Sequence, residues 1–557
     1  MKKEFFLILG VATGLFVSGC KNNNKTSDHV SKTEQTSKLP DMKSAQVTPE
    51  KKQENPPVSL KVETYNPSGL FKDTPLMSVP IKDVLAKLEK VKGTVWYGLY
   101  LMGKKVGYST NEWKIVKTPS GKTVVNYQKF HMEITNMAGK KVVDVSSEMH
   151  FEGEKTGHLL KHVNVQSTPN ETRKFELSRE KNGKYVFYTA TKDKNGAFNM
   201  NKISEIPEPA GLSASELAIA HKISCGNACW KKDEKWKSIK FNYSTGGLST
   251  EVAFVTGAKE EYSRGIKTKL FELKVMTDKP SMTMKTTVDS SGVMVSGNMG
   301  PIELRRMEKT LALKINSTID IGIAALVQTK LEGFKSDKHN KIVLNITGNL
   351  STEVFKYNPD RYKYKKIKDS SGVLTLTKDS VKGLKKVDIK SIKDKQILEA
   401  TKPDHNIESD HAEIKKIAAK IAASSKDPIV QVEKTVNWVF KSITKTMSSD
   451  FDSAVMVAKE LKGDCTEHSL LTTAVLRALG FPARMVGGIG YVEFGEGKTG
   501  FGYHAWVQVY LGRWIDIDPT WNQFPADAGH ILLGSQTDLN WISLIGNIKI
   551  DKVLEIK

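Results

Sequence analysis

The chain has 557 residues and a formal net charge of +22, from 84 basic and 62 acidic side chains. This length is enough for two or three domains. Beyond the N-terminus no stretch is long and apolar enough to span a bilayer, which takes about 20 residues. The sequence also has neither a phosphate-binding P-loop nor an EF-hand loop, so it supports neither a nucleotide site of that kind nor dependence on calcium.

The N-terminus has the pattern of an export signal. A basic start, Met1-Lys2-Lys3, is followed by the apolar segment Phe5–Val17 and then by small residues that lead to Cys20. The apolar segment is too short for a stable membrane span, so we predict a signal peptide at 1–19. Its end resembles a bacterial lipobox, which implies cleavage before Cys20 and attachment of lipid, such as palmitate, to that cysteine. An ordinary signal peptide with an incidental cysteine is the alternative.

A resemblance to the sorting signals of Gram-negative lipoproteins bears on location. Lys21, rather than an aspartate, after the lipidated cysteine implies the periplasmic side of the outer membrane. The outer face of the cytoplasmic membrane is the alternative. Residues 20–64 are rich in Lys, Asn, Ser, Thr and Pro and have few large apolar groups, so we expect a disordered linker that tethers the folded part to the membrane.

Residues 65–400 are predicted to be rich in β-structure, with two modules of sandwich or curved-sheet type. Short β-prone runs alternate with turn signals such as Asn182-Gly183. The expected strands are Thr94–Leu101, Val106–Val116, Lys184–Thr189, Lys269–Val275, Ser281–Val288, Val293–Ser296, Leu311–Thr318 and Lys341–Thr347. One helix, Ser213–Ile223, is expected to interrupt them.

After residue 400 the apolar pattern changes to helical spacing. Asp427-Pro428 suits an N-cap followed by proline at the first helical position. A strand that starts near His504, a turn at Gly512 and a second strand, Arg513–Asp518, follow the helices. This order predicts an α+β domain at 401–557. The expected helices are Ile407–Ser424, Ile429–Thr444, Asp452–Leu461 and Cys465–Leu479.

Three side chains of this region could act together in covalent acyl transfer. Cys465 would open a helix, where unsatisfied backbone N–H groups and the helix dipole favour a thiolate and could stabilise an oxyanion. The paired strands could bring His504, near the start of one, beside Asp518, at the end of the other. A carboxylate in that place would hold the imidazole in one tautomer and stabilise its charged form.

The segments that carry these residues resemble the bacterial branch of the transglutaminase-like superfamily. The matching segments are Gly463–His468, Leu476–Arg484, His504–Trp506 and Asp518–Gln523. The resemblance covers roughly residues 405–540. It implies a papain-like core in which Cys465 is the nucleophile, His504 the base and Asp518 the residue that orients the base. Asp527–His530 is also similar to a segment that follows this aspartate in bacterial members.

Two rival residues remain open at this stage. His468 could replace His504 as the base, but it lies three residues along the same helix as Cys465 and is interpreted as structural. Asp516 could replace Asp518, because a strand period of two places both on one face. Each residue also has an ordinary structural explanation, such as a buried thiol or a turn-forming aspartate, but three such coincidences would be needed in family order.

The other cysteines suggest a disulfide. Cys225 and Cys229 are close enough in sequence to close a small loop in an oxidising compartment. A pair of thiols is the alternative, and a metal site would need two more soft ligands nearby. We therefore expect no metal and no other cofactor.

The positive charge has two explanations. Lys-rich stretches at Arg361–Lys368 and Lys382–Lys395 could bind anionic lipid, lipopolysaccharide or cell-wall polymer. Tyr362 and Tyr364 interleave with the first stretch in a way that superficially resembles a nucleic-acid strip. Solvated surface is the simpler explanation, and we expect no nucleic-acid partner.

The sequence therefore predicts a membrane-anchored cysteine enzyme of the cell envelope, acting on amide or peptide bonds of a protein or peptide through an acyl-thioester. Hydrolysis is favoured over cross-linking. The alternative is a non-catalytic envelope scaffold that binds through its β modules. Val492–Phe501 could be a lid over the site or a plain hairpin connection, and the oligomeric state is not predicted.

Overall fold

The computed structural model describes residues 67–557 except 77–80, 89–92, 120, 137–138, 170–171, 193–195, 207–229, 244–245, 264–265, 279–280, 291, 316, 318, 320–323, 325, 351, 369, 405, 447–452, 495–497 and 536–537. The predicted signal peptide, the linker, the helix Ser213–Ile223 and the cysteines Cys20, Cys225 and Cys229 lie outside these residues. Within the described part of the chain, none of the helices is long and apolar enough to cross a membrane.

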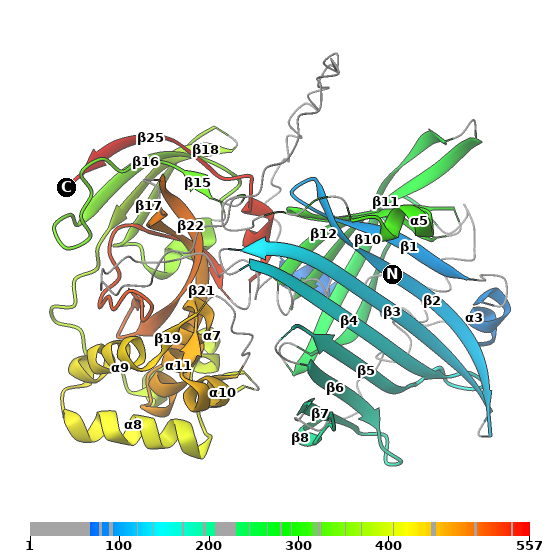
Figure 1. Ribbon diagram of the computed structural model, residues 1–557, viewed down its shortest axis with the longest axis horizontal. Helices are drawn as coiled ribbons and strands as arrows, with labels where there is room; N and C mark the ends of the chain where they lie inside the picture. Colours follow the sequence, from blue (N-terminus) through cyan, green and yellow to red (C-terminus); the bar gives the residue numbers. More distant parts are fainter. Residues whose placement is uncertain are drawn as a thin grey trace, which may run out of the picture.

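One antiparallel sheet of 14 strands forms the N-terminal part, and it curves strongly (Figure 1). Its order is β8-β7-β6-β5-β4-β3-β2-β1-β14-β13-β12-β11-β10-β9, so the first and last strands in sequence pair at the middle of the sheet. The strands are β1 Thr94–Leu101, β2 Lys104–Thr118, β3 Gly121–Asn136, β4 Gly139–Glu152, β5 Leu159–Ser167, β6 Thr172–Arg179, β7 Tyr185–Thr191, β8 Asn201–Ile206, β9 Lys235–Asn242, β10 Gly247–Ser263, β11 Ile266–Asp278, β12 Ser281–Asp289, β13 Met294–Met299 and β14 Ile302–Arg306. Two short helices, α2 Pro67–Asp73 and α3 Ile81–Leu88, precede it.

Alternating burial explains why these segments form strands. In β12 every second side chain is buried, as expected for a sheet with one face on the core. The expected strands Thr94–Leu101 and Val106–Val116 are present and form a hairpin, since β1 and β2 pair at Leu101 and Lys104. A curved antiparallel sheet followed by helices and a second sheet confirms the predicted α+β fold class.

The expected strand Leu311–Thr318 is wrong at its start. The residues Lys309–Leu313 form a short helix, α5, after Glu308. Their alternation of large and small groups imitates a strand, but only Ala312 of this helix is buried, while Leu311 and Leu313 are 53% and 44% exposed. A single buried residue is compatible with either a helix or a strand. The backbone N–H groups of Leu311 and Ala312 both donate to Glu308 O, and these hydrogen bonds form a helical turn.

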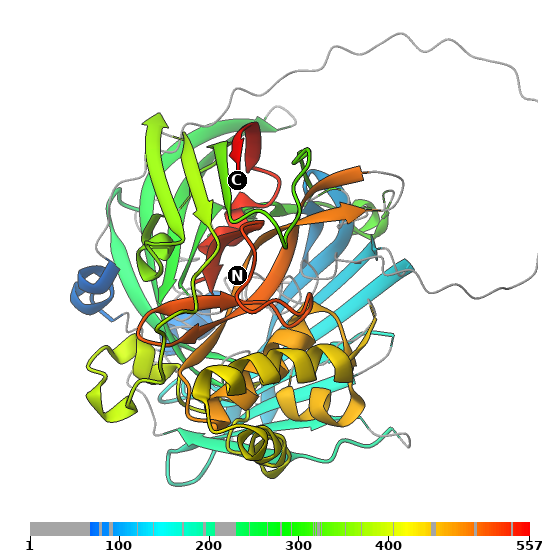
Figure 2. The same ribbon diagram turned by 90° about the vertical axis from the view of Figure 1, so that its left-hand side faces the viewer.

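The C-terminal part combines helices with two further main sheets (Figures 1 and 2). One sheet has the order β15-β22-β21-β24, with β23 paired to β22, and the other the order β17-β18-β16-β25. The strands are β15 Val327–Gln328, β16 Lys341–Thr347, β17 Tyr362–Lys368, β18 Ser371–Thr377, β21 Ala483–Phe494, β22 Lys498–Tyr510, β23 Trp514–Ile517, β24 His530–Ser535 and β25 Lys549–Ile556, with β19 Thr444–Lys445 and β20 Lys462–Gly463 as a separate pair. The helices are η2 Thr352–Tyr357, η3 Ile389–Ser391, α7 Lys395–Glu399, α8 Ala412–Ser424, α9 Pro428–Ser442, α10 Ala454–Glu460, α11 Cys465–Ala478 and η4 Asn540–Leu544.

Two details differ from the sequence expectation. The first helix begins at Ala412 rather than Ile407, because the His411 side chain caps it by accepting a bond from Glu413 N. His504 lies in the middle of its strand, since β22 extends back to Lys498 and pairs with β21 as far as Phe494. The segment considered as a lid is therefore largely the end of a β-hairpin.

The division of the chain at residue 400 stays a prediction, and β16 and β25, which lie on either side of it, are paired.

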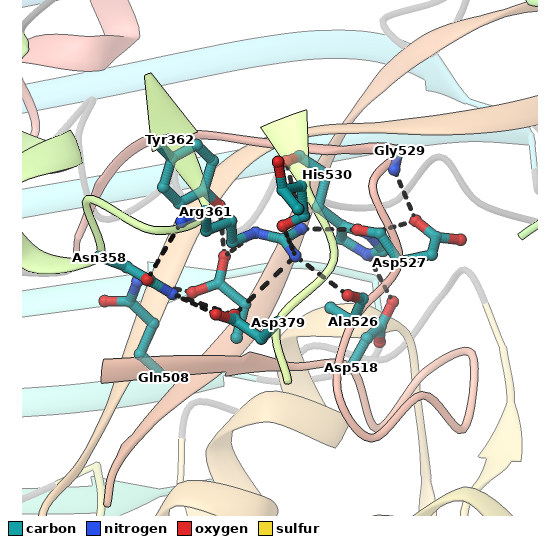
Figure 3. A network of polar contacts seen from close by, with 12 residues as sticks. Asn358, Arg361, Tyr362, Asp379, Gln508, Asp518, Ala526, Asp527, Gly529 and His530 are labelled. Atoms are coloured by element: carbon teal, nitrogen blue, oxygen red, sulfur yellow. Dashed lines mark hydrogen bonds and ion pairs between the residues drawn. The ribbon is translucent and has the colours of Figure 1, made fainter. Parts of the chain in front are cut away.

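A buried polar network joins the sheet β17-β18-β16-β25 to the hairpin β22-β23 (Figure 3). At its centre Arg361 is 1% exposed, and its guanidinium donates to Ala526 O at 3.0 Å and Asp527 O at 2.6 Å. Its Nε lies 3.2 Å from Asp516 Oδ2, an atom that also accepts from the Tyr362 hydroxyl. The sequence places Arg361 in a Lys-rich surface stretch; the structure places it in the interior and leaves the lysines of β17 exposed.

Loss of this guanidinium should be costly. We expect Arg361→Met to lower the free energy of unfolding by about 3–5 kcal/mol, because it leaves buried carboxylates without their cation. Lys365→Met, an exposed position in the neighbouring strand, should change it by less than about 0.5 kcal/mol. Denaturant unfolding of both variants measures the difference. Similar small losses of unfolding free energy in the two variants would contradict the role of Arg361 as the cation that stabilises the buried carboxylates.

Candidate active site

Helix α11 begins with a complete capping box that fixes Cys465 at its first position. The Asp464 carboxylate accepts from Thr466 N at 2.8 Å, and Glu467 Oε2 accepts from Asp464 N at 2.7 Å. Gly463 is required beside this box, because a Cβ there would lie 2.2 Å from the Glu467 Cβ. The box was not among the expectations, although its Asp-x-x-Glu spacing is visible in the sequence.

Cys465 is buried, with 2% of its surface exposed, and it is the one cysteine of the sequence that lies among the described residues. It packs against Ala505 of β22 and Met485 of β21. The candidate nucleophile therefore lies beside the residue that follows His504 in the chain. Its place at a capped helix N-terminus is the one expected from the sequence.

His504 and Asp518 are in direct contact. The ring donates from Nε2 to Asp518 Oδ2 at 2.9 Å, and both side chains are buried. The other oxygen of the carboxylate, Oδ1, accepts from Thr520 N at 2.7 Å and Trp521 N at 3.2 Å. Burial by itself would raise the pKa of Asp518, but the charges and hydrogen bonds of His504 and His530 outweigh it and lower that pKa. The carboxylate is thus held in its charged form.

The second nitrogen of the His504 ring remains available for chemistry. Nδ1 is buried and has no hydrogen-bond partner among the described residues, whereas Nε2 is engaged by Asp518. The ring is stacked on Trp521, with centroids 4.3 Å apart and an interplanar angle of 7°. A base in this setting has a fixed orientation and one unoccupied nitrogen for exchanging a proton.

Glycines of β21 make room for the aromatic rings around His504. In the sheet register Gly488 pairs with His504. A Cβ on Gly488 would lie 2.5 Å from Trp506, and one on Gly490 would lie 2.6 Å from Trp521. The Gly-rich run that the sequence shows here therefore serves close packing of indole rings against a strand.

The structure separates the rival residues from the candidate triad. His468 uses Nδ1 to donate to Asp464 O at 2.6 Å, and burial lowers its pKa to about 4, so it is neutral near pH 7. Asp516 accepts from Gln508 Nε2 at 2.7 Å and pairs with Arg361, away from His504. The structure thus brings together His504 and Asp518, the candidate base and the candidate orienting carboxylate.

A further histidine, His530, lies in the same cluster and had no assigned role. Its Nε2 lies 3.1 Å from Asp518 Oδ2 and its Nδ1 lies 2.9 Å from Asp527 Oδ1. Burial alone would lower the pKa of His530, but the two carboxylates outweigh it and raise that pKa to about 9. His504, Asp518 and His530 present ligand atoms within 4.8 Å of one another, a spacing that would also suit a metal, but hydrogen bonds already join these atoms.

Comparison with known proteins identifies the segment that holds the triad. Residues 415–519 match the family described as the Transglutaminase-like superfamily. The chain contains a transglutaminase-like domain. Over 64 residues it is 39% identical to an uncharacterized protein of Mycobacterium leprae (strain TN). That alignment covers 11% of this chain and 23% of the other, so the chain spans about a quarter of the length of this curated relative.

Solved structures with partial similarity to the chain include three proteins, all of low sequence identity. A proposed cysteine protease of Cytophaga hutchinsonii has a TM-score of 0.26 at 17% identity, covering 39% of this chain and 87% of that one. The periplasmic domain of TgpA of Pseudomonas aeruginosa, bound to ethylmercury, has a TM-score of 0.21 at 20% identity, covering 27% and 55%. A β-barrel-like protein of a domain of unknown function from Brucella abortus has a TM-score of 0.27 at 11% identity, covering 38% and 93%.

The raised pKa of His530 predicts a pH dependence of stability. A group whose pKa rises on folding from about 6.5 to about 9 stabilises the protein fully below pH 6.5 and loses that contribution as the pH rises through 9. Between pH 6.5 and 9.5 we expect the free energy of unfolding to fall by about 2–3 kcal/mol more in the wild type than in His530→Gln. Denaturant unfolding across this range tests it, and parallel pH curves for the two proteins would contradict it.

Proposed function

We propose that the chain is a cysteine enzyme that acts on amide or peptide bonds through an acyl-thioester. In this proposal Cys465 is the nucleophile, His504 the general base and acid, and Asp518 the residue that orients the base. The observation that carries it is the bond from His504 Nε2 to Asp518 at 2.9 Å, which leaves Nδ1 of the same ring without a partner among the described residues. The position of Cys465 at a capped helix N-terminus beside Ala505 supports it.

The proposed reaction has two steps. His504 takes the proton of Cys465, and the thiolate sulfur bonds to the substrate carbonyl carbon while backbone N–H groups at the start of α11 stabilise the oxyanion. The C–N bond breaks as His504 returns the proton to the leaving amine. Water then attacks the thioester and gives a proton to His504, the C–S bond breaks, and a carboxylic acid leaves.

Hydrolysis is favoured over cross-linking in this proposal. Hydrolysis needs only water as the second reactant, whereas transamidation needs a site that excludes water and holds an amine beside the thioester. For an exported lipoprotein we favour limited hydrolysis of a protein or peptide of the cell envelope. The curved sheet β1–β14 would present or hold the substrate for the transglutaminase-like domain.

The proposal also places the protein on a membrane. The lipobox-like end of the signal peptide supports a lipid on Cys20, and the polar composition of residues 21–64 supports a tether. Lys21 favours the periplasmic side of the outer membrane over the outer face of the cytoplasmic membrane.

Alkylation of Cys465 tests the catalytic assignment. In the full chain we expect iodoacetamide to modify Cys465 at pH 6 at least tenfold faster than an ordinary thiol of pKa about 8.5, because an ion pair with His504 maintains the thiolate. Mass spectrometry of the Cys465 peptide measures the rate. His504→Ala should remove the enhancement, whereas His150→Ala on strand β4 of the large sheet should leave it intact. Slow labelling with an ordinary thiol profile would contradict the proposal and favour the non-catalytic scaffold.

Membrane attachment has its own test. In cells of a bacterium that processes lipoproteins, we expect Cys20→Ala to move the chain from the membrane fraction to the soluble fraction, because the acylation site is lost. Cys225→Ala is the matched control and should stay with the membrane. Retention of Cys20→Ala on membranes would refute the lipid anchor at that residue.

A further inference from the structure

Two histidines, His504 and His530, come from the strands on either side of β21 and contact the same carboxylate, that of Asp518. Strand β21 lies between β22 and β24, and its Gly488 pairs with His504 while its Gly490 pairs with His530. The imidazole centroids are 5.8 Å apart, and both rings place Nε2 on Asp518 Oδ2, at 2.9 and 3.1 Å. The absence of side chains on the two glycines leaves the space over β21 in which the rings and Asp518 meet.

The bonding of His530 differs from that of His504. Both ring nitrogens of His530 lie against carboxylate oxygens, Nε2 against Asp518 and Nδ1 against Asp527, so both donate and the ring is an imidazolium. It therefore has no lone pair with which to act as a base. The pKa of His530, raised to about 9 by Asp527 and Asp518 against the effect of burial, agrees with this geometry.

The far side of His530 is anchored rigidly (Figure 3). Asp527 Oδ1 also accepts from Gly529 N at 2.8 Å, and its Oδ2 accepts from Gln523 Nε2 at 2.8 Å. Arg361 donates to the carbonyl oxygens of Ala526 and Asp527, which holds the loop that leads into β24. The anchor thus reaches from the sheet β17-β18-β16-β25 to the candidate triad.

We propose that His530 is a positioning residue of the Cys465–His504–Asp518 site. It shares Asp518 Oδ2 with His504, while the backbone N–H groups of Thr520 and Trp521 hold Oδ1, so the carboxylate has a single orientation toward the base. The inference rests on the proposed function, in which Asp518 orients His504. It extends the working site beyond residues 415–519, since His530 lies outside the matched segment.

The test compares two amide replacements of His530 in the full chain. His530→Gln places an amide nitrogen near the position of Nε2 and can still donate to Asp518, whereas His530→Asn reaches only toward Asp527. We expect the rate of Cys465 alkylation at pH 6 to fall at least tenfold in His530→Asn and to stay within threefold of the wild type in His530→Gln. Both replacements are polar and similar in size, so thermal unfolding can confirm that the two variants are folded to the same extent.

A double-mutant cycle separates positioning from general support of the fold. If His530 acts through Asp518, then His530→Asn should change the alkylation rate by less than twofold in an Asp518→Asn background. Equal losses in His530→Asn and His530→Gln, unchanged rates in both, or a full tenfold effect in the Asp518→Asn background would each overturn the inference. An ordinary thiol profile in the wild type itself would instead refute the proposed function, so the two failures are distinguishable.

Discussion

The arrangement of the site depends on one buried charge, the carboxylate of Asp518. A carboxylate removed from water is tolerated only when hydrogen bonds and opposite charge replace its hydration. Here four donors surround it: the backbone N–H groups of Thr520 and Trp521 on one oxygen, and the rings of His504 and His530 on the other. These donors come from strand β22, from the turn after β23 and from the start of β24, so satisfying one charge fixes three segments relative to one another.

The donors from β22 and β24 can meet at Asp518 because β21, the strand between them, has glycines at the facing positions. Gly488 and Gly490 of β21 leave space for Trp506 and Trp521, which pack around His504 on one face of the sheet. On the other face, the side chains of β22 pack against α9 and α11 through a separate apolar cluster that includes Val432, Val436, Leu476, Val507 and Val509. Aromatic packing on one face of the sheet and helix packing on the other therefore place β22, which contains His504, next to α11, which contains Cys465. The position of Cys465 against Ala505 is a consequence of that layering.

Much of this could be predicted from the sequence because the relevant signals are local. Helical spacing and the Asp427-Pro428 cap predict α9, and the turn at Gly512 predicts the β22-β23 hairpin that brings Asp518 to His504. Strand periodicity could not decide between Asp516 and Asp518, because a period of two gives both residues the same face, and only the family resemblance favoured Asp518. It is decided by Arg361, which lies more than a hundred positions away in sequence and pairs with Asp516. From the lysines around it in the sequence, Arg361 is assigned to a charged surface. The segments that bury it are distant in the sequence, so the residues next to it do not reveal its burial.

The long-range contacts of Arg361 also connect the candidate site to residues outside the segment that matches the family. The segment that matches the family ends at residue 519, directly after Asp518. The polar contacts continue through His530 and Asp527 to Arg361, which directly precedes β17 of a different sheet. A hydrogen-bonded network of buried charges is stable only as a whole, because each member removed leaves another without its partner. The orientation of His504 in β22 therefore depends on the two joined sheets and not on the matched segment alone.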